Sequence, residues 1–229
     1  MEYAQARMQA RHGARPDEAL WQRLSAQSNL AGYLAAARAT PLAAHLIAVA
    51  DRADLHEIER ALRQRWRETV TELAGWLPRE WQAAVHWCAV LIDLPALAWL
   101  SAGGAPQRWM QKDPVLAAHL AASAALGPVG RAAWHQAWRQ RWPDGVREDV
   151  DALARLAAAV ERHLAAFVQL PAGAAFDARR ALVHEAERGF RRLAFRPVVA
   201  FAYLLLVALD LERMRADLVV RALDAEGAR

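Results

Sequence analysis

The stretch that most constrains the fold lies near the C-terminus, where residues 198–209 form an unbroken apolar run that ends at Asp210. A helix that spans a bilayer needs about 20 apolar residues, so this run is too short to cross a membrane. Charged residues follow at once, including Glu212, Arg213 and Arg215. A helix with one apolar half and one charged half is typical of the centre of a soluble helical domain whose far end meets a partner.

The rest of the chain repeats apolar residues with helical spacing. Asp54 and Glu57 have the spacing of a capping box, which predicts the start of a long helix. We expect Pro78 to end this helix and Pro95 to interrupt the next one. No segment alternates apolar and polar residues with period two, so we predict an all-α fold, an elongated bundle of antiparallel helix pairs and degenerate helical repeats. The apolar positions of the long helix step by three or four: Leu55, Ile58, Leu62, Trp66, Val70, Leu73 and Leu77.

A glycine- and proline-containing loop at residues 101–106 is the best candidate for a boundary along the chain. We therefore predict an N-terminal helical lobe at 1–104 and a C-terminal helical lobe at 105–229. The length of the chain equally allows one continuous domain.

Composition limits the cellular setting and the partners. The formal net charge is +4, a mild excess that permits an acidic partner, nucleic acid or anionic lipid without requiring one. The single cysteine, Cys88, cannot form an internal disulfide, which indicates a reducing compartment. The first twenty residues contain no apolar core of a signal peptide, so we expect a cytoplasmic protein.

The motifs of catalysis are missing from the sequence. His184-Glu185 begins like a zinc-peptidase motif, but Arg188 stands where the second histidine is required. There is no glycine-rich phosphate loop and no nucleophile elbow around a serine. We therefore predict no catalytic residues, no metal, no cofactor, no small-molecule substrate and no enzymatic activity of the chain itself.

Trp134, Trp138 and Trp142 recur every four residues and are interleaved with arginines. Such a pattern could stack on the bases of a nucleic acid, but base-stacking platforms are usually sheets or grooves. Burial against a neighbouring helix is the better interpretation, so we do not expect nucleic acid as a partner.

Several short strings resemble one protein family. Tyr3 and Arg7 match its opening Tyr-x-x-x-Arg segment, and residues 33–42 are similar to the helix that follows. Residues 93–97, which begin with Asp93, correspond to its Asp-φ-x-Asn-Leu signature. Residues 200–204 resemble its Phe-Ala-Tyr segment. Asp210 and Glu212 fall on the paired acids after that segment, and Arg215 lies near the family's Asn/Arg position. The chain thus resembles the C subunit of A-type ATPases, which is equivalent to the d subunit of the eukaryotic V-type ATPase.

This resemblance implies a non-catalytic helical socket that couples the central stalk to the membrane ring during ATP-linked ion transport. Its partners would be rotor-ring and central-stalk subunits, which would place it peripherally at the inner face of the membrane. It would contact the membrane only through these partners. Tyr3, Arg7, Asp93, Asp210, Glu212 and Arg215 become candidate interface or repeat-signature residues.

The chain also departs from the family. Its members are longer and carry three pseudo-repeats of helices, whereas two are recognisable here, and Ala96 replaces the signature asparagine. The alternatives are a stand-alone helical interaction protein that kept this fold, or a basic helical nucleic-acid binder. Each charged residue after Leu209 could also serve only in helix–helix salt bridges.

Overall fold

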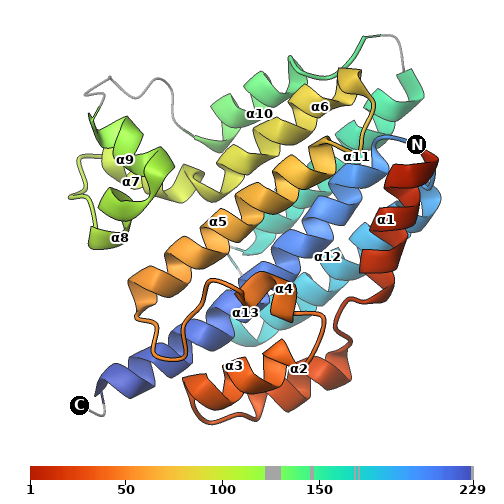
Figure 1. Cartoon of the computed structure of the whole chain (residues 1–229). Helices are drawn as coiled ribbons and strands as arrows, with labels where there is room; N and C mark the ends of the chain where they lie inside the picture. The colour runs from red at the N-terminus through yellow and green to blue at the C-terminus, as the bar shows by residue number, and fades with distance from the viewer. Residues whose placement is uncertain (122–129, 145–146, 168, 170, 228–229) are drawn as a thin grey trace. The chain divides into compact units, whose positions relative to one another are not determined.

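A computed structural model describes residues 1–121, 130–144, 147–167, 169 and 171–227 (Figure 1). These ranges consist of helices and their connections and contain no strand. The all-α fold predicted from the apolar periodicity is therefore confirmed.

The helices form two compact units, each assembled from three separate segments. Unit 1 contains Met1–Gly13, Val70–His86 and Arg141–Asp210, and unit 2 contains Ala14–Thr69, Trp87–Gln140 and Leu211–Arg229. Helices α5 (Leu55–Ala74) and α13 (Val199–Gly227) contribute one end to each unit. The units are groups of packed segments rather than successive lobes, so the predicted boundary between residues 104 and 105 stays a prediction.

Unit 1 is held together by aromatic side chains from separate helices. The rings of Trp81 and Phe201 meet edge to face at 6.1 Å, and His12 stacks on Phe190 at 4.4 Å. Few residues separate α11 from α12, and the two helices pack together, so they run antiparallel. The complete helices of this unit are α1 (Glu2–Gly13), α6 (Arg79–His86), α11 (Arg147–Phe167) and α12 (Ala172–Arg192).

The apolar run of the sequence forms the first half of α13. From Val198 to Leu209 its side chains are buried or nearly so within unit 1. Burial of a Val, Leu or Phe side chain contributes about 1.5–3 kcal/mol. The run therefore accounts for much of the core of this unit.

Unit 2 is built from shorter helices whose starts follow the expected capping rules. The side chains of Asp17 and Asn29 accept hydrogen bonds from the N–H groups of Leu20 and Gly32. Asp54 and Glu57 form the predicted capping box, each bonding the other's N–H group. The complete elements of this unit are α2 (Glu18–Ser25), α3 (Leu30–Arg38), α4 (Ala43–Leu46), η1 (Trp87–Ile92), α7 (Leu94–Ser101), α8 (Arg108–Lys112), α9 (Pro114–Ala121) and α10 (Arg131–Arg139).

The helix breaks differ from the predictions around both prolines. Helix α5 ends at Ala74, four residues before Pro78, and the turn that follows still buries Leu77. The next helix changes to 3₁₀ geometry at Trp87, so it breaks before Pro95 is reached. Pro95 lies in the first turn of α7, where its missing N–H group is tolerated.

The tryptophans of α10 are used for packing, as predicted. Trp134 and Trp138 are buried and their rings stack at 5.2 Å. The indole N–H of Trp87 donates to the carbonyl of Trp134 at 3.1 Å, and Trp134 returns the bond at 3.2 Å. The spacing of these tryptophans also predicts a helix over residues 131–142, which is too long, because α10 ends at Arg139, before Trp142. The sequence also predicts a helix over residues 114–126; α9 covers its first part, and residues 122–126 lie outside the described ranges.

Cys88 provides a test of this packing. It is 4% exposed, and burial raises the pKa of its thiol. Because the thiolate is the reactive form, we expect a thiol reagent at mildly alkaline pH to label native protein at least about 100-fold more slowly than protein in urea. Labelling rates measured by absorbance check this. Complete reaction of native protein within the mixing time would contradict the buried position.

Candidate functional site

Helix α5 carries a row of charged residues beside its apolar stripe. Glu59, Arg63 and Arg67 follow one another at intervals of four, so they lie on one face of the helix. Their positions are adjacent to the buried Ile58 and Leu62. The middle of this charged row is therefore buried, and Arg63 is only 3% exposed.

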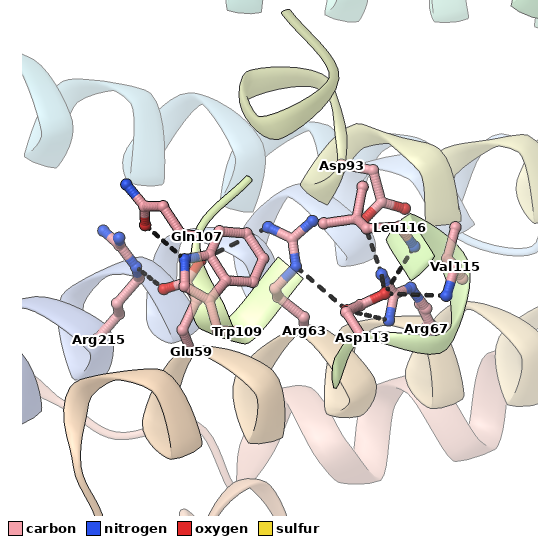
Figure 2. Close-up of polar contacts among 10 residues, drawn as sticks. All are labelled: Glu59, Arg63, Arg67, Asp93, Gln107, Trp109, Asp113, Val115, Leu116 and Arg215. Atoms are coloured by element: carbon pink, nitrogen blue, oxygen red, sulfur yellow. Dashed lines mark hydrogen bonds and ion pairs between the residues drawn. The ribbon is translucent and has the colours of Figure 1, made fainter. Parts of the chain in front are cut away.

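Two carboxylates meet this row (Figure 2). Asp93 is the residue before α7. Its side chain accepts one hydrogen bond from Arg63 and another from Arg67, the latter at 2.6 Å. Asp113, before α9, binds Arg67 in a two-bond fork at 2.9 and 3.0 Å. Its Oδ2 also lies 3.5 Å from Arg63 Nε. Two arginines and two aspartates thus share one buried cluster, called here the Arg–Asp cluster.

Asp113 also caps a helix. Its Oδ1 accepts from the backbone N–H groups of Val115 and Leu116 at 3.0 and 3.1 Å. The Arg–Asp cluster therefore joins the side chains of α5 directly to the first turn of α9.

Trp109 closes one side of the cluster. The guanidinium carbon of Arg63 lies 4.5 Å from the centre of the Trp109 ring, within the range of a cation–π contact. The indole N–H donates to Gln107 at 2.7 Å (Figure 2). Trp109 itself belongs to an apolar group with Ala96, Leu97 and Leu116. These apolar side chains thus shield the buried charges of the cluster from solvent on this side.

The charges in the cluster balance one another. Burial alone would raise the pKa of Asp113, but the hydrogen bonds from Arg67 and from the Leu116 N–H outweigh it, and the pKa lies below its ordinary value. Burial would likewise lower the pKa of Arg67, and its bonds to Asp113 and Asp93 raise it instead. Both carboxylates accept hydrogen bonds from guanidinium groups, so their oxygens are occupied within the cluster.

The cluster continues to the C-terminal helix. Glu59 lies 3.5 Å from Arg63 and accepts from Arg215 of α13 at 2.6 Å. Asp93 and Arg215, two of the candidate residues, are therefore the ends of one chain of ion pairs that runs through Arg63 and Glu59 (Figure 2).

Other residues of α13 bind the short helices of unit 2. Arg213 forms a two-bond fork with Glu18, and its guanidinium lies 4.9 Å from the centre of the Trp21 ring. Asp217 accepts from the Tyr33 hydroxyl at 3.4 Å. Burial and then the Asp217 charge raise the pKa of Tyr33. The charged half of α13 is thus engaged within its own unit.

Arg221 caps the C-terminal end of helix α2. It is buried and donates to the backbone carbonyls of Ser25 and Gln27, each at 2.9 Å. Its guanidinium lies 4.7 Å from the centre of the Tyr33 ring. The last carbonyls of a helix need such donors, so α2 is capped by the C-terminal helix.

The remaining candidate residues lie elsewhere. In unit 1, Arg7 donates to the Tyr3 hydroxyl at 2.9 Å and its guanidinium lies 4.7 Å from the centre of a Trp76 ring. Asp210 is buried near the middle of α13, and Glu212 is exposed. The structure therefore links Asp93 to Arg215 only through Arg63 and Glu59, and it leaves the other four candidate residues outside this chain of ion pairs.

Sequence reasoning missed the inner members of the site. Arg63, Arg67 and Asp113 were not singled out, although the first two stand beside an apolar stripe at i, i+4 spacing. Asp113 precedes a proline that opens a helix, which is a capping signal. These signals mark a capped helix and a charged row, but neither indicates that the two meet.

A recess elsewhere in unit 2 has a volume of about 220 Å³ and lies between Leu30, Ala53 and Ala222. Its lining includes no histidine, cysteine or hydroxyl side chain, so it offers no nucleophile paired with a base. Within the described ranges no three His, Cys, Asp or Glu side chains are arranged to hold a metal ion.

Comparison with known proteins adds no relative: no family model, no curated protein and no solved structure matches this chain.

In the described part of the chain no single helix is long and apolar enough to cross a membrane. One bent pair, Arg79–Ile92 with Leu94–Ser101, reaches that length and composition only when the two helices are taken together.

Replacing Asp113 by Asn tests the charge balance. Asparagine keeps a capping oxygen for α9 but leaves two buried arginines facing one aspartate. We expect the free energy of unfolding to fall by about 3–5 kcal/mol, measured by urea denaturation. The exposed Asp177→Asn is the control and should change it by less than about 0.5 kcal/mol. A loss at Asp113 no larger than in the control would contradict the buried pairing.

The lowered pKa of Asp113 also predicts a pH dependence. A carboxyl with a depressed folded pKa stabilises the protein fully above its unfolded pKa of about 3.9, and this stabilisation is lost as pH falls through the folded value. We expect wild-type urea midpoints to fall more steeply below about pH 4 than those of Asp113→Asn, which cannot titrate there. Parallel pH profiles for the two proteins would show that Asp113 is not the group responsible.

Proposed function

We propose that the chain is a non-catalytic helical socket in a rotary ATPase, which couples a central stalk to a membrane ring. The observation that carries this proposal is the ion-pair chain from Asp93 to Arg215. The resemblance had picked out these two positions from distant segments, and they meet through Glu59 and Arg63. Two short sequence matches that arose by chance would not be expected to belong to one chain of ion pairs.

The fold supports the same role. A socket transmits torque only if its helices keep their relative positions under load. Buried ion pairs and a helix cap supplied by another helix favour one arrangement of unit 2. The acidic and basic side chains after Leu209 then orient helices, and their exposed parts remain available to rotor partners.

A second candidate is a stand-alone interaction protein that kept this fold. It is favoured by the internal use of the signature residues, since Asp93 and Arg215 are already paired within the chain. In that case the signature preserves the fold while the partner differs.

An affinity pull-down from gently solubilised native membranes, followed by mass spectrometry, distinguishes the two. We expect the tagged protein to recover proteolipid-ring and central-stalk subunits. Arg215→Glu, which places a like charge against Glu59, should recover less of both because the end of α13 is no longer held. Arg155→Glu on the exposed face of α11 makes the same charge change and should recover the wild-type amount.

Absence of ring and stalk subunits from the wild-type sample, with the intact ATPase present in the same membranes, would reject the socket role. Recovery of a different, defined set of proteins would support the stand-alone alternative.

A further inference from the structure

Phe195 occupies an unusual position in the turn between α12 and α13. In the part of the chain that the structure describes, it is the one residue other than glycine with a positive φ, at 64°. Bulky side chains rarely adopt this left-handed region, which favours glycine or asparagine. Burial of the side chain does not offset the cost of this backbone conformation, because Phe195 is 60% exposed. Packing within the chain therefore gives no reason for a phenylalanine here.

Neighbouring elements hold this turn in place. The N–H of Phe195 donates to the side chain of the buried Gln5 at 2.9 Å, and Arg196 donates to Asp149 at 2.5 Å. Contacts from α1 and α11 thus fix the backbone on both sides of an outward aromatic ring. Strain that the surrounding structure maintains is typical of functional positions.

Helix α12, which leads into this turn, carries a basic stripe. Arg180, His184, Arg188 and Arg191 are spaced by four, four and three residues, so they share one face, and all four are exposed. The opposite face is buried. Its side chains are Leu182, Ala186 and Phe190. The stripe therefore points away from the core of unit 1.

Much of this charge is not neutralised locally. Arg180 pairs with Asp177, and His184 lies 3.6 Å from Glu187. Arg188, Arg191 and the adjacent Arg192 form no salt bridge within the described ranges. Arginines in a last turn are favoured by the helix dipole, but the dipole does not explain an exposed phenylalanine directly after them.

A second exposed phenylalanine stands at the other end of the stripe. Phe176 is 49% exposed, and the guanidinium of Arg180 lies 6.0 Å from the centre of its ring. Helical rise places Phe176 about 24 Å from the end of α12 at Arg192. Aromatic rings near opposite ends of a helix of this length are too far apart to stack on successive bases of a nucleic acid, whereas an extended lipid surface can receive both.

We propose that the exposed face of α12 from Phe176 onward, together with Phe195 in the turn that follows, binds an anionic lipid surface. The arginines would contact lipid headgroups, and the two phenylalanines would enter the boundary between headgroups and acyl chains. Residues 176–196 hold six arginines and three acidic residues, so the segment is attracted to negative lipids. This surface lies within unit 1 and does not depend on the socket proposal.

Flotation of the purified full chain with lipid vesicles tests the proposal. We expect binding to vesicles of equal parts phosphatidylcholine and phosphatidylglycerol, weakening as salt is raised, and little binding to phosphatidylcholine alone. Arg188→Gln, Arg191→Gln and Arg192→Gln together should weaken binding about 100-fold, at about fivefold for each arginine. The control replaces three exposed arginines of α11, Arg147, Arg155 and Arg162, by Gln and removes the same charge. It should bind like the wild type.

Phe195→Asn separates lipid binding from folding. Asparagine tolerates the left-handed backbone, so the thermal midpoint should be unchanged or higher. Loss of the aromatic ring should still weaken vesicle binding about tenfold.

Three results would overturn the proposal. They are no binding of the wild type to the mixed vesicles, equal losses in the two triple variants, or tighter binding to a single-stranded RNA oligomer than to the vesicles. Vesicle binding by a protein that recovers no ATPase subunits would reject the socket and leave the lipid surface standing.

Discussion

The pairing of Arg63 and Arg67 with Asp93 and Asp113 is the constraint on which the organisation of unit 2 depends. A charge taken out of water is costly unless it is both paired and hydrogen-bonded, and here each carboxylate receives guanidinium N–H groups. Arginine suits this position because its planar fork binds a carboxylate with two parallel bonds, which lysine cannot do. A hydrophobic core tolerates some sliding of helices, but these bonds require α5, the start of α7 and the start of α9 to meet in one geometry.

The local elements were accessible from sequence because their signals are local. The capping box at Asp54 and Glu57 and the apolar run before Asp210 act over a few residues, and both were predicted correctly. Helix ends were less predictable. The change to 3₁₀ geometry at Trp87 has no proline or glycine to mark it.

The Arg–Asp cluster was not accessible in the same way. Its members come from residues 63, 67, 93 and 113, and their meeting depends on tertiary packing rather than on spacing. Asp93 and Arg215 were selected through a resemblance, which indicated their positions but not their shared contacts through Glu59. The conformation of Phe195 could not be predicted for a related reason, because a positive φ cannot be inferred for a phenylalanine from its neighbours in the chain.

The capping of α2 by Arg221 links the order of synthesis to the order of folding. Helix α2 is synthesised before α13, and the donor for the Ser25 carbonyl follows 196 residues later. Until then the Ser25 carbonyl lacks this donor, and an isolated helix of eight residues is marginal on its own. The beginning of unit 2 must therefore wait for its end, which makes this unit a late-forming part of the molecule during translation.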